Sequence, residues 1–434
     1  MKNIIIGAGI TGLSAAYHMA DDCIILEKEG SAGGLCRSVR AGGYTFDYTG
    51  HLLHLRNPYT KRLIFNLLRC NIKKIKRDAW IFSHDTYTRY PFQANLYGLP
   101  HKVIADCLSG LIEAKIRQQS GRRPAASGGV LSFRDWTIKT FGMGFAKHFF
   151  FPYNRKLWTV DESELTDEWV ASFVPNPTLE ETILGAFTMQ TKQYGYNASF
   201  YYPVKGGIQS LIDALLERIR SPLLNTPAIK IDMKKKRITS TKGAFTYKNI
   251  ISTMPLPELL NIIENVPQKM KAFGEKLRWN SVMCFNLGYD ATDINDSKHW
   301  VYFPEKKFMF YRAGFYHNFS KFMAPAGKAS LYVEVSHTPG EKPDPYRTAS
   351  ALQRQLMACG IAKRDKSPGI TNILPMPYAY IIYDRNRTAA VREIHSFLNK
   401  NGIYSIGRFG GWKYSYIEES ILDSKTVVEK IKGA

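Results

Sequence analysis

The first 26 residues alternate between short apolar runs and a helical spacing. Residues 3–7 form a continuous apolar run that ends in glycine, which predicts a buried strand. Apolar residues with helical spacing follow at 12–19, and a second apolar run at 23–26 predicts another strand. This order of elements predicts a βαβ unit and a parallel sheet at the start of the chain.

The later chain divides into a mainly helical stretch and a stretch rich in strands. Helical spacing occurs at 59–70, an alternating pattern at 78–90 predicts a β-hairpin, and residues 99–195 are mostly helical. A segment rich in Gly, Ser, Arg and Pro interrupts the helical stretch at 120–129, and we expect it to be mobile. Further strands are predicted at 198–202, 228–233, 250–253, 281–289, 300–312, 330–336, 379–383 and 403–406, before a helix from residue 419.

Three glycines follow the first predicted strand, and an acidic residue ends the second. Gly7, Gly9 and Gly12 stand between the first strand and the helix, and Glu27 ends the second strand. Such glycines allow a tight turn, the approach of a pyrophosphate to the backbone, and close packing of helix on strand. The N–H groups of the helix N-terminus would bind phosphates, and Glu27 would accept hydrogen bonds from ribose hydroxyls. Together these features predict a dinucleotide-binding domain.

The residues that follow favour FAD over NAD. The segment 31–38 carries Gly33, Gly34 and Arg37, and it resembles an extension found in the flavoprotein superfamily of amine oxidases, protoporphyrinogen oxidases and pyranose mutases. In that superfamily, a second glycine pair and an arginine approach the pyrophosphate and the flavin. Gly407 and Arg408 open a segment that resembles the superfamily's returning FAD segment. The resemblance implies an FAD domain built from both ends of the chain.

Six further blocks resemble one family, the UDP-galactopyranose mutases. In chain order they are the histidine loop at 46–54, YPFQ at 90–93, PYN-x-K-x-W at 152–158, YP-x-x-GG at 202–207, YFPE and FYR within 302–312, and GRFG-x-W-K-Y at 407–414. The blocks keep the family's order over nearly the whole chain. The pattern is closer to the eukaryotic-type mutases and their bacterial relatives than to the short bacterial type.

This resemblance implies a nucleotide-sugar mutase. In the family, reduced flavin N5 attacks the anomeric carbon of a pyranose carried on a nucleotide diphosphate. The sugar recloses as a furanose by way of a covalent flavin–sugar intermediate, and such furanoses feed surface polysaccharides or secondary metabolites. The flavin must be reduced beforehand, with NADPH or NADH as one implied reductant, and Arg77 matches a family position near the nicotinamide cofactor.

The same resemblance implies roles for individual residues. Arg312 would clamp the diphosphate, and Tyr380 and Tyr414 would donate hydroxyls to it. Gly50 and His51 would face flavin N5, with His51 acting either as a general acid or through the conformation of its loop. Substrate-binding positions are implied for Tyr90, Gln93, Asn154, Trp158, Asn197 and Tyr302.

The chain also departs from the family pattern. Phe173 stands where the family has a second diphosphate arginine, and Phe319 stands where it has a tyrosine. A nucleotide sugar other than UDP-galactose is therefore an alternative substrate, with Lys205 or Lys413 as substitute cations. An FAD-dependent oxidoreductase of the amine oxidase or protoporphyrinogen oxidase type is the alternative function. The alternative interpretation of Arg312 is a surface arginine on a strand that does not bind the diphosphate.

From these features we expect an α/β fold with a Rossmann-type FAD-binding domain, a helical insertion and an antiparallel-sheet substrate domain. The expected FAD domain comprises residues 1–90, 196–270 and 391–434. The expected helical insertion is 91–195, and the expected substrate domain is 271–390.

A net charge of +22 adds an attraction for anions such as nucleotide sugars or acidic lipid headgroups. It is concentrated at 73–77 and 234–237, and solvated surface is the plainer interpretation of both blocks. The sequence contains no nucleic-acid motif, signal peptide or long apolar run, so we expect a cytoplasmic protein without nucleic-acid partners. Peripheral membrane contact is an alternative. The six scattered cysteines argue against a metal site.

Overall fold

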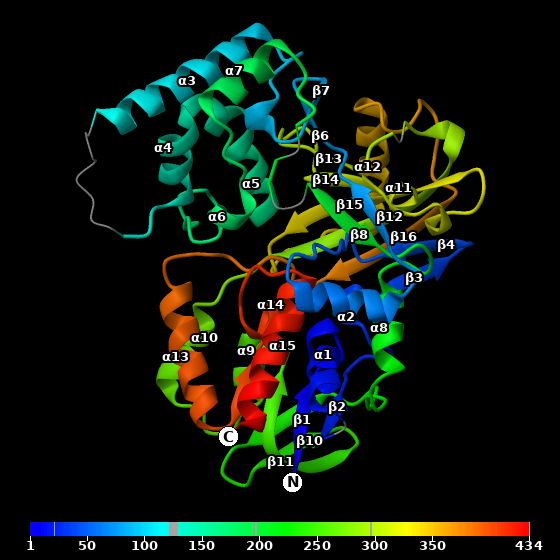
Figure 1. Cartoon of the computed structure of the whole chain (residues 1–434), viewed down its shortest axis with the longest axis vertical. Coiled ribbons are helices and arrows are strands. Elements are labelled where there is room, and N and C mark those ends of the chain that lie inside the picture. The colour runs from blue at the N-terminus through cyan, green and yellow to red at the C-terminus, as the bar shows by residue number, and fades with distance from the viewer. Residues whose placement is uncertain (21, 121–128, 193, 196–197, 296, 434) are drawn as a thin grey trace.

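A six-stranded sheet joins segments from the start, middle and end of the chain, in the lower part of Figure 1. The computed structural model describes residues 1–20, 22–120, 129–192, 194–195, 198–295 and 297–433. The parallel strands of the sheet are, in spatial order, β2 (Cys23–Leu26), β1 (Lys2–Ile6), β11 (Gly243–Ser252) and β17 (Ile403–Ser405). The antiparallel strands β10 (Arg237–Ser240) and β9 (Ala228–Asp232) continue it from the first half of β11.

Side chains of β1 alternate between two cores because successive residues of a strand point to opposite faces. Ile5 packs in a core with the helices α1 (Ile10–Met19), α2 (Pro58–Leu68), α8 (Gln209–Leu216) and α15 (Ile417–Lys432). Ile4 and Ile6 pack in a core with α9 (Leu256–Ile262), α10 (Gln268–Glu275) and α13 (Arg387–Lys400). Helices therefore cover both faces of the sheet, and the predicted α/β fold with its Rossmann-type domain is confirmed.

A seven-stranded sheet lies above the first one. Its strands are, in spatial order, β16 (Ile370–Met376), β12 (Ser281–Asp290), β15 (Lys328–His337), β14 (Arg312–Phe315), β13 (Trp300–Tyr302), β6 (Ala79–Ser83) and β7 (Thr86–Arg89). All neighbours are antiparallel except β13 and β6, which are parallel. The predicted hairpin at 78–90 is confirmed as β6 and β7, and it belongs to this sheet.

Both faces of strand β12 are buried, which explains why apolar residues occupy successive positions at 282–285. Phe285 and Leu287 face a core shared with α12 (Pro345–Ala358). Val282 and Cys284 face a second core that extends into the helical part of the molecule. The sheet is thus packed between one helix on one side and the helical bundle on the other.

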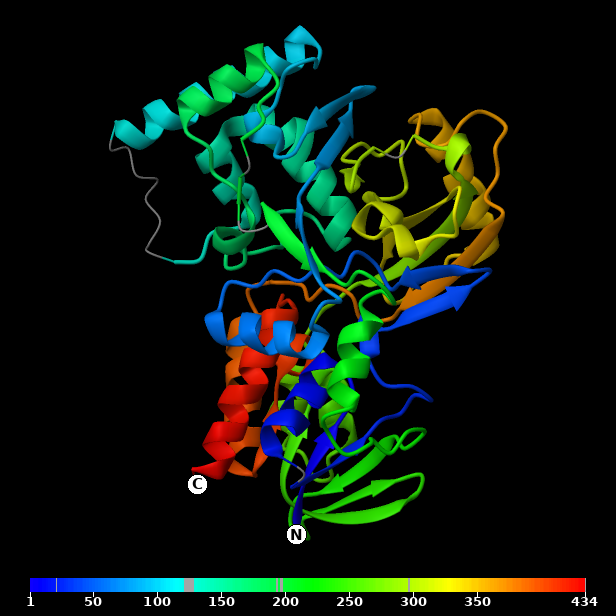
Figure 2. The ribbon, with the colours of Figure 1, turned by 45° about the vertical axis from the view of Figure 1, so that its right-hand side comes forward.

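The helical bundle occupies the upper left of both views (Figures 1 and 2). It contains α3 (His101–Gln119), α4 (Phe133–Phe145), α5 (Phe151–Trp158), α6 (Val170–Phe173) and α7 (Leu179–Phe187). Glycines allow α3 and α4 to approach closely, since a Cβ on Gly144 would lie 2.0 Å from the carbonyl oxygen of Asp106. Of the segment that we expected to be mobile, residues 121–128 lie outside the described residues.

Two predicted strands are wrong. The strand predicted at 300–312 is interrupted, because β13 ends at Tyr302 and β14 begins at Arg312. The carbonyl groups of Phe303 and Phe310 between them accept hydrogen bonds from the Lys156 ammonium instead of from a neighbouring strand. The segment 379–383 forms only an isolated bridge at Ile381, because the carbonyl of Ala379 is taken by an arginine.

Several short elements complete the fold. They are β3 (Ser38–Ala41), β4 (Tyr44–Asp47), β5 (Lys73–Lys76), β8 (Ser199–Tyr202), α11 (Tyr316–Phe319) and α14 (Gly407–Gly410). Among the described residues, no helix combines the length and apolar character that a bilayer crossing requires. The expected domain boundaries at 90, 195, 270 and 390 stay a prediction.

The contact between β1 and α1 generates the first testable prediction. A Cβ on Gly12 would lie 1.9 Å from the carbonyl oxygen of Gly7, so strand and helix would have to separate. We expect Gly12→Ala to lower the free energy of unfolding by about 1–3 kcal/mol, as overpacking does. It should also lower the flavin-to-protein ratio of the purified protein. Urea unfolding and visible absorbance measure the two effects.

The matched control is Gly340→Ala, because a Cβ at Gly340 would meet nothing within 4 Å. This variant should keep the stability and flavin content of the unmodified chain. If both variants behaved alike, the close contact at Gly12 would not be what holds strand and helix in place.

Candidate active site

Two glycine-rich segments meet at the carboxyl end of β1. The N–H of Gly33 donates to the carbonyl of Ala8 at 2.8 Å. A Cβ on Gly34 would lie 3.3 Å from the Cα of Gly9, and the φ of 55° at Gly34 also favours glycine. The backbone around the start of α1 therefore stays accessible to a ligand that approaches closely.

The C-terminal part of the chain returns to the same place. Gly407 has a φ of 77°, and a Cβ on it would lie 2.5 Å from Thr11 Oγ1 in the first turn of α1. A left-handed backbone conformation favours glycine at this position. The N-terminus of α1 is thus flanked by the segments 33–34 and 407–410, and its partial positive charge suits a diphosphate.

Glu27 lies buried at the end of β2 and faces the same turn. Its Oε2 accepts the N–H of Ala8 at 2.6 Å, and its Oε1 accepts the N–H of Glu29 at 2.9 Å. An ionised carboxylate offers about four acceptor positions. Two therefore remain for the hydroxyls of a ribose.

Two arginines are held beside these loops by backbone carbonyl groups. Arg37 Nε donates to the carbonyl of Gly34 at 2.9 Å. Arg408 donates from Nε and Nη2 to Ala379 at 3.1 and 2.7 Å, and from Nη1 to Ser415 at 2.9 Å. Since neither bond set involves a carboxylate, both positive charges stay available to an anion.

Taken together, this edge of the sheet fits FAD. A helix N-terminus and two arginines suit the pyrophosphate, the cleared glycine backbone admits it, and Glu27 suits a ribose. The residues concerned are Gly7, Gly9, Gly12, Glu27, Gly33, Gly34, Arg37, Gly407 and Arg408.

The segment 46–54 connects this edge with the seven-stranded sheet. Its anchor is the buried carboxylate of Asp47, which accepts the hydroxyls of Ser38 and Tyr202, both at 2.6 Å. Burial raises the pKa of Asp47 to about 6. Further along, a Cβ on Gly50 would lie 2.5 Å from the hydroxyl oxygen of Tyr332, so only glycine fits there.

His51 lies between the two halves of the site. Burial, followed by the positive charges of Arg408 and Arg312, lowers its pKa to about 4. The imidazole is therefore neutral near pH 7. Because both arginines act on it, His51 marks the place where the FAD edge and the residues around Arg312 come together.

Arg312 forms a two-point ion pair with a buried glutamate. In the sheet, Arg312 is opposite Tyr302 on β13 and opposite Glu334 on β15. Its Nε and Nη2 both donate to the Glu334 carboxylate, the second at 2.8 Å. Glu334 is fully buried, whereas the Arg312 side chain keeps 20% of its surface exposed. Arg312 is therefore held in one orientation and still reaches the space beside it.

Six tyrosines gather around Arg312. The hydroxyl oxygens of Tyr311 and Tyr380 are 3.4 Å apart, and the rings of Tyr380 and Tyr414 stack at 5.8 Å. The ring of Tyr302 lies 5.3 Å from Tyr90 and 5.5 Å from Tyr153. Burial raises the pKa of Tyr380 and Tyr414, so both hydroxyls stay protonated. The group, which we call the tyrosine cluster, comprises Tyr90, Tyr153, Tyr302, Tyr311, Tyr380 and Tyr414.

Three further predicted substrate residues lie in the wall behind this cluster. Gln93 donates to the carbonyl of Pro175 at 2.5 Å, and Asn154 accepts the indole N–H of Trp158 at 3.0 Å. All three side chains are buried, and Trp158 lies 5.4 Å from Tyr380. They shape the wall, and their contact with substrate stays a prediction. Asn197 lies outside the described residues.

The departures from the family pattern affect this wall. The ring of Phe173 lies 4.5 Å from that of Tyr414, so an apolar side chain occupies this position beside the cluster. Phe319 is a fully buried core residue that packs on Tyr202. Lys413 forms ion pairs with Glu419 and Asp423. The Lys205 ammonium lies over the exposed ring of Phe322, so the suggestion that either lysine replaces the missing arginine is not supported.

Sequence reasoning did not single out two residues of the site. One is Glu334, which orients Arg312, and the only signal was a charged residue within an apolar strand. The other is Lys156, whose ammonium donates to the carbonyls of Phe303 and Glu305, both at 2.7 Å. Lys156 stood within the motif at 152–158 and fixes the turn that leads into Arg312.

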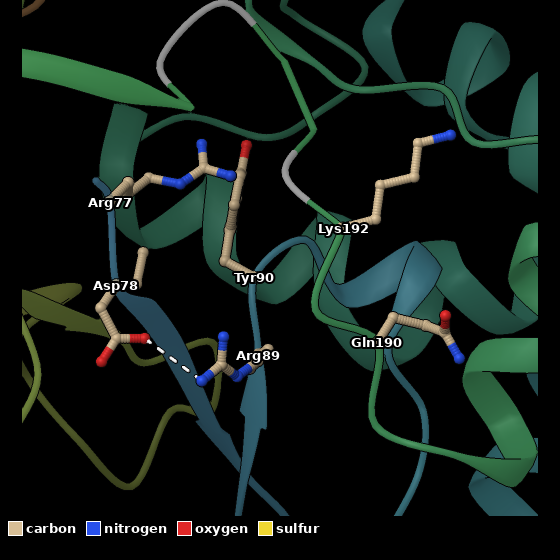
Figure 3. Close-up of a pocket in the computed structure, with 7 residues that line it drawn as sticks. Arg77, Asp78, Arg89, Tyr90, Gln190 and Lys192 are labelled. Atoms are coloured by element: carbon tan, nitrogen blue, oxygen red, sulfur yellow. Dashed lines mark ion pairs between the residues drawn. The ribbon is translucent and has the colours of Figure 1, made fainter.

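A small pocket opens on the outer side of Tyr90 (Figure 3). Arg77 is buried, its guanidinium lies 4.8 Å from the Tyr90 ring centroid, and it donates to the carbonyl of Tyr194 at 3.0 Å. Arg89 pairs with Asp78 at 3.9 Å in the same view. Gln190 and Lys192 lie across the pocket from these residues. Arg77 is therefore an internal neighbour of the tyrosine cluster.

Known proteins resemble this chain at the levels of family, sequence and fold. The family model of flavin-containing amine oxidoreductases matches residues 10–370. An uncharacterised protein from the nifH2 3′ region of Methanothermococcus thermolithotrophicus is 39% identical over 74 residues, which cover 16% of this chain and 71% of that protein.

Solved structures agree with this result. A reduced UDP-galactopyranose mutase superposes with a TM-score of 0.92 at 27% identity, over 100% of this chain and 94% of that one. A redesigned putrescine oxidase (TM-score 0.68, 14% identity, 100% and 99% covered) and a fatty acid isomerase from P. acnes (0.67, 12%, 99% and 98%) share the fold. These findings confirm the resemblance identified in the sequence and FAD as the cofactor.

The lowered pKa of His51 predicts a pH effect on stability. Between the ordinary pKa of histidine and about 4, the unfolded chain binds a proton at His51 that the folded chain does not. The free energy of unfolding should therefore fall as the pH falls through this window. His51→Gln should show a shallower decrease from pH 7 to pH 5 in urea unfolding. A decrease of equal slope in both proteins would contradict a neutral His51.

Proposed function

The chain belongs to the family of flavin-containing amine oxidoreductases, and on this premise we propose that it interconverts the pyranose and furanose forms of a sugar carried on a nucleoside diphosphate. The observation that carries the proposal is the position of Arg312 beside the tyrosine cluster and His51. The likeness to a reduced UDP-galactopyranose mutase over the full length supports it.

Arg312 suits a diphosphate because of how Glu334 holds it. A guanidinium has five N–H donors, and Glu334 takes two of them. Three donors remain on a side chain whose orientation is already set, which reduces the entropy lost when a phosphate binds. Arg312 would therefore act as a rigid clamp for phosphate oxygens.

Tyr380 and Tyr414 would complete this clamp. Burial raises their pKa, and protonated hydroxyls can donate to phosphate oxygens. The Arg408 guanidinium lies 5.2 Å from the Tyr380 ring centroid and 5.0 Å from that of Tyr414. Arg408 would thus orient both rings and add positive charge on the side toward the cofactor.

His51 would serve as a neutral group next to the reacting sugar. With a pKa of about 4 it holds no extra proton to give near pH 7. Its role would be to orient the loop that begins at Asp47 and to offer a hydrogen bond, in preference to general acid catalysis. Gly50 would allow this loop to lie against Tyr332.

Reduced FAD, when bound, supplies a nucleophile for the anomeric carbon and thereby frees the nucleotide as a leaving group. The protein's own part is to hold the departing diphosphate with Arg312 and the tyrosine hydroxyls until the ring has reclosed. The aromatic wall of Trp158 and Phe173 would exclude water, which otherwise would hydrolyse the sugar. NADPH or NADH would reduce the cofactor, with Arg77 beside Tyr90 as the proposed contact.

The first experiment tests the reaction itself. The purified holoenzyme, reduced with dithionite without oxygen, would be incubated with UDP-, dTDP- and GDP-hexopyranoses. We expect a furanose product from one of them, detected by chromatography, only with the reduced enzyme. If no sugar were converted, and if the flavin were instead reduced by a small-molecule donor and reoxidised by oxygen, the protein would be an oxidoreductase of the amine oxidase type.

A further prediction concerns the clamp. Arg312→Lys keeps a positive charge but loses the fork that pairs with Glu334, so we expect kcat/KM to fall about 10- to 100-fold, as loss of one or two charged hydrogen bonds would cause. Glu334→Gln should raise KM through a less ordered Arg312. Full activity in Arg312→Lys would contradict the clamp.

The control for these variants is Arg89→Lys, which changes an arginine in the pocket of Figure 3. Arg89 pairs with Asp78 and lies over Trp80, and neither of these contacts involves Arg312 or the tyrosine cluster. Its kcat/KM should stay within about twofold of the unmodified enzyme, as expected for a change at a partly exposed ion pair.

A further inference from the structure

Three segments that are far apart in the sequence are tied together on one side of the molecule. β5 and β8 pair as an antiparallel ladder, with β8 marked in Figure 1. Asn71, before β5, accepts the N–H of Lys205 at 2.8 Å and donates to its carbonyl at 3.1 Å. The hydroxyl of Ser320 donates to the carbonyl of Val204. The segments 71–76, 201–205 and 320–323 therefore form one surface.

An exposed aromatic ring stands among lysines on this surface. Phe322 keeps 41% of its surface exposed. The ammonium of Lys205 lies 4.8 Å from its ring centroid, and that of Lys321 lies 5.4 Å from it. Lys73 is opposite Tyr202 in the ladder, and the Tyr202 hydroxyl lies 3.6 Å from the sulfur of Met323, the residue after Phe322. Burial and then the positive charge of Lys321 lower the pKa of Lys73. Lys74 points to the opposite face of β5, with Tyr201.

The charges of this surface are not balanced. In the part of the chain that the structure describes, no carboxylate forms an ion pair with Lys73, Lys205 or Lys321. Some other surface lysines have such partners, as Lys230 does with a glutamate at 2.7 Å. The three ammonium groups and the exposed ring therefore present a positive surface that attracts an anionic partner.

We propose that the protein docks on an anionic lipid surface through this patch, which we define as Lys73, Lys205, Lys321 and Phe322. The lysines would contact the headgroups, and the ring would enter the boundary between headgroups and acyl chains. The docking is independent of the proposed mutase reaction, because none of the four residues belongs to the tyrosine cluster or the FAD edge.

The composition of the patch favours lipid over nucleic acid. Proteins that bind single strands interleave several aromatic platforms along a basic groove. Here Phe322 is the exposed ring, whereas Tyr201 is half-buried on the other face of β8, with the Lys61 ammonium 5.9 Å from its centroid. A single apolar tip surrounded by ammonium groups suits an interface that has one polar and one apolar layer.

The test is sedimentation of the full-length holoprotein with vesicles. Vesicles of phosphatidylcholine alone would be compared with vesicles that also contain phosphatidylglycerol, at low and high salt. We expect binding to the anionic vesicles only, and weaker binding at high salt. Flavin absorbance and thermal unfolding would check that each variant is folded.

Two variants locate the binding. Lys73→Ala/Lys205→Ala/Lys321→Ala should reduce partitioning about a hundredfold, at roughly fivefold for each lysine near the surface. Phe322→Ser should reduce it about tenfold, and this loss should persist at high salt because it is apolar in origin.

The matched control removes three lysines from another basic surface. Lys234→Ala/Lys235→Ala/Lys242→Ala takes the same charge from turns of the six-stranded sheet and should leave partitioning nearly unchanged. Equal losses in both triple variants would mean attraction by net charge alone and would overturn the proposal. A lack of binding to anionic vesicles would also overturn it. So would an oligonucleotide that displaces the vesicles, if Phe322→Ser also weakened the binding of that oligonucleotide.

Discussion

The close approach of backbone to backbone at the carboxyl end of β1 is the constraint on which the rest of the structure depends. Gly9 contacts Gly34, and Gly407 contacts the first turn of α1, so segments from both ends of the chain share one small space. A side chain at Gly34 or Gly407 would crowd the facing segment, since packed interiors hold few voids. The FAD edge, and with it the place of His51 and Arg312, follows from these contacts.

The second organising feature is the way in which the interior holds cations. Arg408 and Lys156 are surrounded by backbone carbonyls, whereas Arg312 is held by the buried Glu334. Carbonyls orient a cation without neutralising it, so the charge of Arg408 still acts on His51. A carboxylate orients Arg312 more strongly and leaves part of its fork exposed. The site therefore has two guanidinium groups, those of Arg312 and Arg408, that are held in fixed orientations beside the tyrosine cluster.

Much of the fold could be predicted from the sequence because its signals are local. The apolar run and glycines at 3–12 predicted the βαβ unit, and alternation at 78–90 predicted the hairpin. The strand predicted at 300–312 is interrupted where Pro304 and the charged residues 305–307 stand, which are poor strand formers. A lysine about 150 residues earlier competes for carbonyl groups in this segment. β16 was missed for a related reason, since its pairing with β12 and not its own pattern makes it a strand.

The sequence by itself determined where glycine was required and which periodicity each segment carried. It also determined which family the chain resembles and which cofactor that family implies. Those properties depend on single residues and their nearest neighbours along the chain. The tertiary structure alone decided that Glu334 orients Arg312, that His51 is neutral, and that Lys205 and Lys321 lie over Phe322. Electrostatic energies depend on distance and burial, and the sequence contains neither until the chain has folded.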